Sequence, residues 1–239
     1  MLKLNKLIKS FAGKFDPVLQ GIDLSLKSGE FCVIIGSNGS GKSTLMRCIS
    51  GEYLVDTGTI EMNKNAVISS ITQDVNKGTI PEMTLLENIS LSRIANKSAS
   101  LKLYNHNKDE IITIIKELNL GLEAYIDQPL SVLSGGQRQM IATLMAFSSK
   151  PEILLLDEHT SALDPKHQHL LMEYTASHIN KYNITSLMIT HKLEDAVRYG
   201  NRLIMLHQGR IVLDLNEQEK KKLDANALLN LFHQHEDQI

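Results

Sequence analysis

The sequence predicts an α/β fold built on a mostly parallel sheet. Short apolar runs at residues 31–35, 153–156 and 184–190 are typical of buried strands, and each is followed by polar residues and then by a helical pattern. Strands that alternate with helices form parallel sheets with helical crossovers, so this order indicates the α/β class. The 239 residues suffice for one sizeable domain, and we expect a single domain over residues 1–239.

Composition and charge exclude several classes of protein. The formal net charge of -2 gives the chain no global attraction to nucleic acid. No apolar run approaches the roughly 20 residues that a membrane helix needs. Cys32 and Cys48 fall in apolar patterns, where buried free thiols are expected rather than a disulfide. We therefore expect a protein that is soluble by itself, is located in a reducing cytoplasm and has no nucleic-acid partner.

Residues 77–150 depart from the strand–helix alternation because they carry helical signals and little strand character. Thr84 followed by Glu87 is a capping box that opens one helix. Apolar residues at 111, 112, 114, 115 and 118 form the stripe of another helix. We expect residues 77–150 to be a helical subdomain inserted into the α/β domain.

A glycine-rich loop follows the first of these strands and precedes a helical run. Its backbone N–H groups can surround phosphate oxygens, Lys42 can reach the β and γ phosphates, and Ser43 can ligate Mg²⁺. A plain glycine-rich turn is the alternative, which the strand–loop–helix order disfavours. The predicted phosphate-binding residues are Gly36, Ser37, Asn38, Gly39, Ser40, Gly41, Lys42, Ser43 and Thr44.

Two acids end the strand at residues 153–156. Asp157 and Glu158 would lie at the carboxyl edge of the sheet, where ligands of open α/β sheets bind. Asp157 is predicted to hold Mg²⁺ through the water shell of the ion, and Glu158 is predicted to orient or deprotonate an attacking water.

The stretch LSGGQ at residues 133–137 resembles a loop that leads into a helix, but no neighbouring motif indicates what it binds. Ser134 and Gln137 have capping-box spacing, which places the glycines in the first turn of a helix. Free N–H groups and the helix dipole favour an anion at that position.

The glycine-rich loop, Gln73, LSGGQ and the acid pair occur in the order seen in ATPase subunits of ABC transporters, and the resemblance covers nearly the whole chain. It implies a P-loop NTPase core, an N-terminal antiparallel β part and an inserted helical subdomain that carries the signature. It also implies ATP and Mg²⁺ as cofactors and hydrolysis of ATP to ADP and phosphate. In this family the signature faces the γ-phosphate of ATP held by a second subunit. The signature residues are Leu133, Ser134, Gly135, Gly136 and Gln137.

The same resemblance implies roles for further residues. Gln73 resembles the glutamine that touches Mg²⁺ and the attacking water, and His191 resembles the histidine that contacts the γ-phosphate. Phe11 matches the aromatic residue that stacks on adenine, although Phe15 competes for this role and core packing is another explanation. The implied metal-binding residues are Ser43, Gln73 and Asp157. The loop that would join two ATP sites across a dimer consists of Ser161, Ala162, Leu163 and Asp164.

One departure from the family pattern narrows the resemblance. His159 follows the acid pair where many relatives have proline, and with residues 78–89 and 201–214 it resembles a bacterial subgroup described as tryptophan/tyrosine or uncharacterised uptake-system ATPases. We therefore expect import of a small solute such as an amino acid. The implied partners are a second ATPase subunit, as a homodimer, integral membrane permease subunits and a substrate-binding protein. The implied location is cytoplasmic, peripheral on the inner face of the cell membrane.

Two other functions share part of this pattern. A soluble ABC-type ATPase acting on nucleic acid or ribosomes would share every ATP motif, but the chain has neither a long coiled coil after Gln73 nor two ATPase units. A P-loop kinase would explain Lys42 and Asp157 and leave LSGGQ and His191 without a role. We therefore favour the transporter ATPase.

Overall fold

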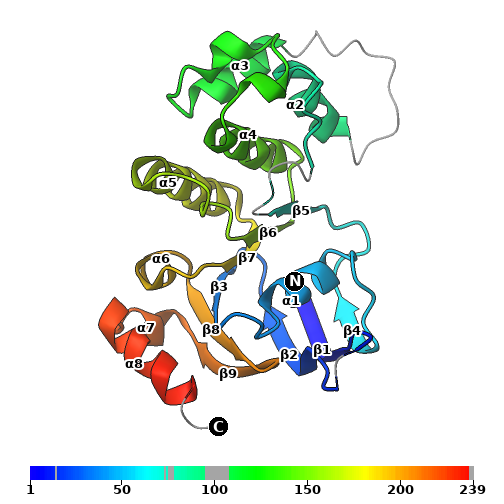
Figure 1. Ribbon diagram of the computed structural model, residues 1–239, viewed down its shortest axis with the longest axis vertical. Helices are drawn as coiled ribbons and strands as arrows, with labels where there is room; N and C mark the ends of the chain where they lie inside the picture. The colour runs from blue at the N-terminus through cyan, green and yellow to red at the C-terminus, as the bar shows by residue number, and fades with distance from the viewer. Residues whose placement is uncertain (14, 73, 75–77, 95–107, 237–239) are drawn as a thin grey trace. The chain divides into compact units, whose positions relative to one another are not determined.

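The computed structural model describes residues 1–13, 15–72, 74, 78–94 and 108–236 (Figure 1). These residues form two compact units. The first consists of Met1–Ala66, Leu155–Glu158 and Ile179–Ile239, and the second of Val67–Leu154 and His159–His178.

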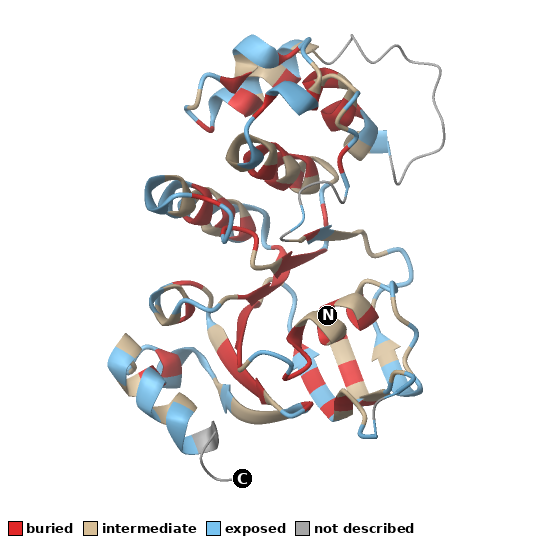
Figure 2. Cartoon of the chain, in the orientation of Figure 1, coloured by how far each residue is buried: buried red, intermediate tan, exposed pale blue. Residues whose placement is uncertain are grey.

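The first unit contains a small antiparallel sheet at its N-terminal end. The strands β1 (Leu2–Lys9), β2 (Leu19–Leu26) and β4 (Thr57–Glu61) lie in the order β2-β1-β4. Apolar and polar residues alternate along β2, so that one face of the strand is buried and the other is exposed (Figure 2). This sheet is the antiparallel part that the family resemblance implied.

Six strands pair in the order β5-β6-β7-β3-β8-β9. These strands are β3 (Phe31–Ile35), β5 (Ile68–Ile71), β6 (Ile153–Asp157), β7 (Thr185–Ile189), β8 (Arg202–His207) and β9 (Arg210–Leu215). The pairs β3–β7 and β3–β8 are parallel, whereas β9 pairs antiparallel with β8. Every residue of β3 and β7 is buried, as expected for parallel strands with both faces covered (Figure 2). The predicted α/β class is confirmed.

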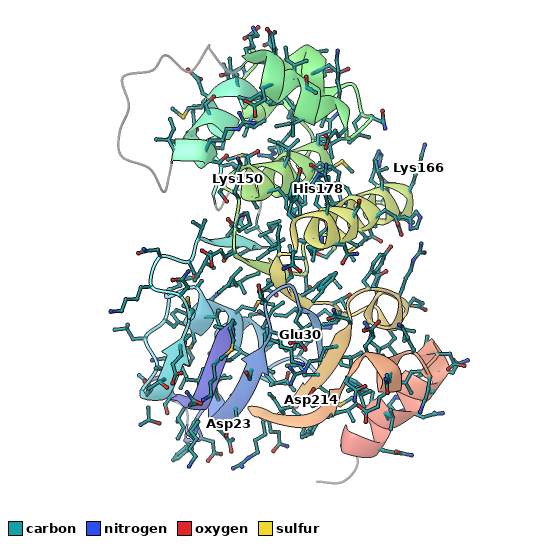
Figure 3. All side chains as sticks on the ribbon, turned by 180° about the vertical axis from the view of Figure 1, so that it is seen from behind. Asp23, Glu30, Lys150, Lys166, His178 and Asp214 are labelled. Carbon is teal, nitrogen blue, oxygen red and sulfur yellow. The ribbon has the colours of Figure 1, made fainter. Side chains whose placement is uncertain are left out.

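Within the first unit, Arg202 of β8 links the antiparallel sheet to the strands β8 and β9. Its guanidinium donates through Nε and Nη2 to both carboxylate oxygens of Asp214 on β9, at 2.8 and 2.7 Å. Nη1 donates to the carbonyl oxygen of Ser25 on β2 at 2.7 Å and to Glu30 at 3.2 Å. Figure 3 labels the two carboxylate residues, Glu30 and Asp214. A planar bidentate donor suits this arrangement better than a lysine would.

The C-terminal helices α7 (Glu217–Lys220) and α8 (Ala225–Glu236) follow β9, and a buried lysine anchors them. Lys220 is 3% exposed, and its Nζ donates to the carbonyl oxygens of Tyr199 and Gly200, just after α6 (Leu193–Arg198). A cation is favoured at the C-terminal end of a helix. Burial nevertheless lowers the pKa of Lys220 to about 8, because the charged form loses its hydration.

The second unit holds the helices α2 (Leu85–Ile94), α3 (Lys108–Lys116), α4 (Gly135–Ser148) and most of α5 (Pro165–Tyr182), with short 3-10 turns at Leu122–Tyr125 and Leu130–Val132. The predicted capping box at the start of α2 is confirmed. The Thr84 N–H donates to the Glu87 carboxylate at 2.8 Å, and the Glu87 N–H donates to the Thr84 hydroxyl at 3.2 Å.

One apolar cluster holds these helices together. Ile111, Ile115 and Leu118 are buried in it, and Ile112 and Ile114 pack against its margin, so the predicted stripe is confirmed. Residues from α2, α4 and α5 complete the cluster, including Leu86, Leu144 and Leu171. Burial of each large aliphatic side chain contributes about 1.5–3 kcal/mol.

Both cysteines are buried free thiols, as predicted, and burial raises the pKa of Cys32 to about 12. Among the helices of the described ranges, none has the length and the apolar character needed to cross a membrane.

Candidate functional site

The glycine-rich loop connects β3 to α1 (Lys42–Ile49) in the first unit. Gly36 and Gly41 have φ angles of 150° and 104°, in the region that disfavours side chains. A Cβ at Gly36 would lie 2.1 Å from the Leu206 carbonyl oxygen, and a Cβ at Gly41 would lie 2.8 Å from the Val18 carbonyl oxygen. The segments at Leu206 and Val18 pack against the loop and leave no room for a side chain at either glycine.

Lys42 is the first residue of α1, and its side chain contacts this loop. Its Nζ donates to the carbonyl oxygens of Gly36 and Ser37, both at 2.8 Å. Burial lowers the pKa of Lys42, and the nearby carboxylates of Glu158 and Asp157 partly oppose that shift. Within the described ranges, the buried hydroxyl oxygen of Ser40 has no hydrogen-bond partner. An ammonium group and an unpaired hydroxyl in one loop suit a phosphate ligand.

Ser43 and Asp157 come together at the start of α1 and the end of β6. Burial raises the pKa of Asp157, and a hydrogen bond from the Ser43 hydroxyl opposes the shift by stabilising the carboxylate. The described residues hold no ready-made cluster of His, Cys, Asp and Glu side chains for a metal. Mg²⁺ does not need one, since it is commonly bound through one or two protein oxygens, water and substrate phosphates. The Ser43–Asp157 pair fits that mode of binding.

Glu158 and His191 form the second polar pair. Glu158 follows β6, His191 follows β7, and the carboxylate Oε1 lies 2.7 Å from the imidazole Nε2. These strands are neighbours, so both side chains stand at the carboxyl edge of the sheet, as predicted for Glu158. Glu158 has a φ of 51°, a left-handed conformation that is uncommon for residues other than glycine. Its N–H donates to the Ile189 carbonyl oxygen at 3.2 Å.

A single cavity of the first unit brings these groups together. Lys42, Ser43, Glu158 and His191 line it with Phe11, as do Val18, Asn38, Gly39, Gly41 and Thr44. Phe15, in contrast, is 106% exposed and is not among the lining residues. The structure therefore favours Phe11 over Phe15 as the aromatic residue of this cavity.

The signature stretch begins α4 in the second unit. Ser134 is the N-cap, and its hydroxyl accepts from the Gln137 N–H at 3.2 Å while the Gln137 side chain accepts from the Ser134 N–H at 2.9 Å. The predicted capping box is thus confirmed. Gly135 is exposed and has open space around its α-carbon. The first turn of α4 therefore presents its N–H groups at an accessible surface.

The loop of residues 161–164 packs against the signature within the second unit. A Cβ at Gly136 would lie 2.8 Å from the Leu163 side chain, and Leu163 and Leu133 are both buried in the apolar cluster. Ser161 and Ala162 are exposed. Asp164 caps α5 by accepting from the N–H groups of residues 166 and 167 at 3.1 and 3.2 Å.

One predicted site residue lies outside the described ranges, and one cavity residue was not predicted from the sequence. Gln73, predicted from the sequence, lies outside the described residues. Val18 lines the cavity although no motif contains it.

His159 is buried, and its Nε2 lies 3.4 Å from the Thr175 hydroxyl. Burial lowers the pKa of His159 to about 4. An imidazole in place of proline is thus a neutral packing residue of the second unit.

The family described as ABC transporter matches residues 19–161, which include the phosphate loop, the signature and the acid pair. The chain belongs to this family. Among curated relatives of this ABC transporter subunit, the tyrosine transport ATP-binding protein of Clostridioides difficile (strain R20291) is 39% identical over 97% of this chain and 98% of its own length. The glutamine transport ATP-binding protein GlnQ of Escherichia coli (strain K12) is 34% identical over 95% and 98%.

A solved structure supports the same assignment. The ATP-binding cassette MJ0796, as a dimer in a post-hydrolysis state bound to ADP and Pi, matches this ABC transporter subunit with a TM-score of 0.79 and 27% identity over 91% of this chain and 99% of that one. The protein is therefore an ATP-binding ABC ATPase. The relatives named here are transport proteins, and these findings do not support a nucleic-acid or ribosome-acting ATPase.

Proposed function

We propose that this ATPase subunit couples ATP binding and hydrolysis at an interface between two copies of the chain to transport through separate membrane subunits. The observation that carries hydrolysis is the 2.7 Å contact between Glu158 and His191. Both side chains line the same cavity as Lys42. This arrangement puts a carboxylate base, a histidine and a phosphate-binding ammonium within reach of one nucleotide.

Each group has a task that its chemistry suits. Lys42 neutralises charge on the β and γ phosphates, and Ser43 with Asp157 holds Mg²⁺. Glu158 orients and deprotonates the attacking water, while His191 contacts the γ-phosphate as charge develops. Mg²⁺ held by Ser43 and Asp157 would supply further neutralisation of phosphate charge. We also assign Gln73 to Mg²⁺ and the attacking water, on the family resemblance alone.

The dimer proposal concerns the second unit. Ser134 and Gly135 at the exposed start of α4 would bind the γ-phosphate of ATP held by the partner chain. On the family resemblance, residues 161–164 would join the two ATP sites; within the second unit their Leu163 packs against the signature glycine Gly136. The dimeric state of the similar cassette MJ0796 supports this proposal.

The proposed transport direction is import. Curated relatives serve tyrosine transport, glutamine transport and phosphonates import, which supports an uptake system with membrane permease subunits and a substrate-binding protein. We place the subunit on the cytoplasmic face of the membrane, bound to its permease. We propose an amino acid as the solute and test tyrosine first, since the tyrosine-transport relative is 39% identical over 97% of this chain.

The test is uptake by the complete complex in lipid vesicles, assembled from this subunit, its membrane permease subunits and its substrate-binding protein. We expect ATP-dependent accumulation of labelled tyrosine, and expect Lys42→Ala to abolish both ATP hydrolysis and accumulation, because it removes the charge on the phosphates. A matched control is Lys222→Ala, an exposed lysine on the C-terminal segment. ATP hydrolysis by Lys42→Ala at the wild-type rate would contradict the phosphate-site assignment. Accumulation of glutamine in place of tyrosine would correct only the substrate.

A further inference from the structure

A second aromatic ring supports Phe11. Tyr53, in the segment after α1, meets the Phe11 ring edge to face, with 5.3 Å between the ring centroids and 73° between the planes. The opposite charges of ring face and ring edge favour this arrangement over free rotation. The Lys9 ammonium lies 5.3 Å from the centroid of the Phe11 ring. The plane of the Phe11 ring is therefore set by its neighbours.

Helix α1 fixes Tyr53 in turn. Arg47 of α1 donates from Nη1 to the Tyr53 hydroxyl at 2.8 Å, and the Tyr53 N–H donates to the Arg47 carbonyl oxygen at 3.0 Å. The Arg47 guanidinium carbon also lies 5.5 Å from the centroid of the Tyr53 ring. Since α1 begins with Lys42, this chain of contacts connects the phosphate loop to the aromatic ring of the cavity.

A second attachment aligns the two chain segments that carry these rings. The Asp56 carboxylate accepts from the Lys9 ammonium at 2.9 Å and from the Ser10 N–H at 2.6 Å. The Asp56 N–H donates to the Ile8 carbonyl oxygen at 2.9 Å. Asp56 is thus bound to the residues just before Phe11, so the segment that carries Tyr53 is held beside the segment that carries Phe11.

We infer that Tyr53 is a positioning residue for nucleotide selection. Together with Arg47 it fixes the orientation of the Phe11 ring and its distance from the phosphate loop. The inference rests on the proposed function, in which Phe11 stacks on adenine. A ring held in this way gives up less conformational entropy when a base stacks on it. The site should therefore discriminate a triphosphate with an aromatic base from a triphosphate without one.

The experiment compares the affinities of the full chain for ATP and for inorganic tripolyphosphate, each with Mg²⁺, by calorimetry. Tyr53→Leu should weaken ATP binding by about two- to tenfold, the range expected for loss of one aromatic pair. Tripolyphosphate binding should stay unchanged, because the phosphate loop is intact. Tyr53→Phe keeps the ring and loses the bond to Arg47, so we expect it to fall between wild type and Tyr53→Leu. Tyr182→Leu, an exposed tyrosine that is not among the cavity-lining residues, is the matched control.

A double-variant cycle separates this inference from the proposed function. In a Phe11→Ala background, Tyr53→Leu should have no further effect on ATP affinity, since it acts through the Phe11 ring. Equal losses of ATP and tripolyphosphate affinity in Tyr53→Leu would overturn the inference and show a structural role. If Phe11→Ala weakened ATP binding but Tyr53→Leu did not, the inference would fail and adenine stacking by Phe11 would stand. If Phe11→Ala left ATP binding unchanged, the adenine assignment and this inference would fail together.

Discussion

At the residue scale, the Glu158–His191 hydrogen bond joins two groups with different proposed tasks. Glu158 acts on water, whereas His191 acts on the phosphate as its charge grows. Interactions made only in the transition state change turnover and leave ground-state binding nearly intact. The two residues can therefore be separated by kinetics.

We predict that His191→Ala lowers kcat by about 100-fold and changes ATP affinity by less than about threefold. Steady-state ATPase assays of the reconstituted complex, combined with nucleotide-binding measurements, check this result. The control is His169→Ala, which changes an exposed histidine of α5. A fall in ATP affinity with unchanged turnover at saturation would show that His191 only shapes the site.

The sequence was sufficient to find the site residues that lie in short motifs. Lys42 and Ser43 follow the glycine-rich loop after one strand, and Asp157 and Glu158 end another, so their places after strands already indicate a shared edge of the sheet. Val18 and Tyr53 could not be found in this way. They reach the cavity or its aromatic ring through packing between segments that are distant in sequence, and no periodicity encodes those contacts.

At the element scale, helix starts were predictable because a capping box is a local structure. The bonds of Thr84 with Glu87 and of Ser134 with Gln137 involve residues three apart in the chain, so residue type and spacing predict them. The packing of Leu163 under Gly136 is not local, and only the fold reveals it. The start of α4 therefore combines a capping box at Ser134 with close packing at Gly136.

The exposed start of α4 leads to a prediction about association. In Glu158→Gln the metal and phosphate groups remain while the base is lost, so ATP should persist and hold two chains together. Adding Gly135→Asp places a carboxylate where a phosphate should bind, and like-charge repulsion should return the protein to monomer with ATP binding to each chain retained. Light scattering at high protein concentration with ATP and Mg²⁺ measures the change.

The matched control for association is Ser131→Asp in the same Glu158→Gln background. It adds the same charge at an exposed residue just before the signature. This variant should still dimerise on ATP. Persistent ATP-driven dimers of the Gly135→Asp double variant would remove the signature from the interface and with it the proposed two-chain mechanism.

At the scale of the whole molecule, buried Lys220 makes stability depend on pH. Its pKa is about 8 in the folded chain and 10.5 for an unperturbed lysine. Between these values the unfolded chain binds a proton that the folded chain has lost, so the free energy of unfolding should rise with pH. The rise from this group is at most about 1.4 kcal/mol per pH unit.

We predict that Lys220→Met removes this part of the pH dependence. The difference in unfolding free energy between the wild type and the variant should be flat below the folded pKa of about 8 and should increase toward 10.5. Urea denaturation across this pH range measures the difference, and exposed Lys222→Met should leave the wild-type dependence unchanged. A constant difference at every pH would mean that Lys220 keeps an ordinary pKa.

At Glu158 the left-handed backbone favours a different residue for stability than the proposed function requires. Glycine or asparagine adopts a φ of 51° at lower conformational cost than glutamate, by on the order of 1 kcal/mol for glycine. Neither can deprotonate water. Laboratory evolution that selects only for soluble expression should therefore enrich glycine or asparagine at position 158, whereas selection for growth on the imported solute should retain glutamate.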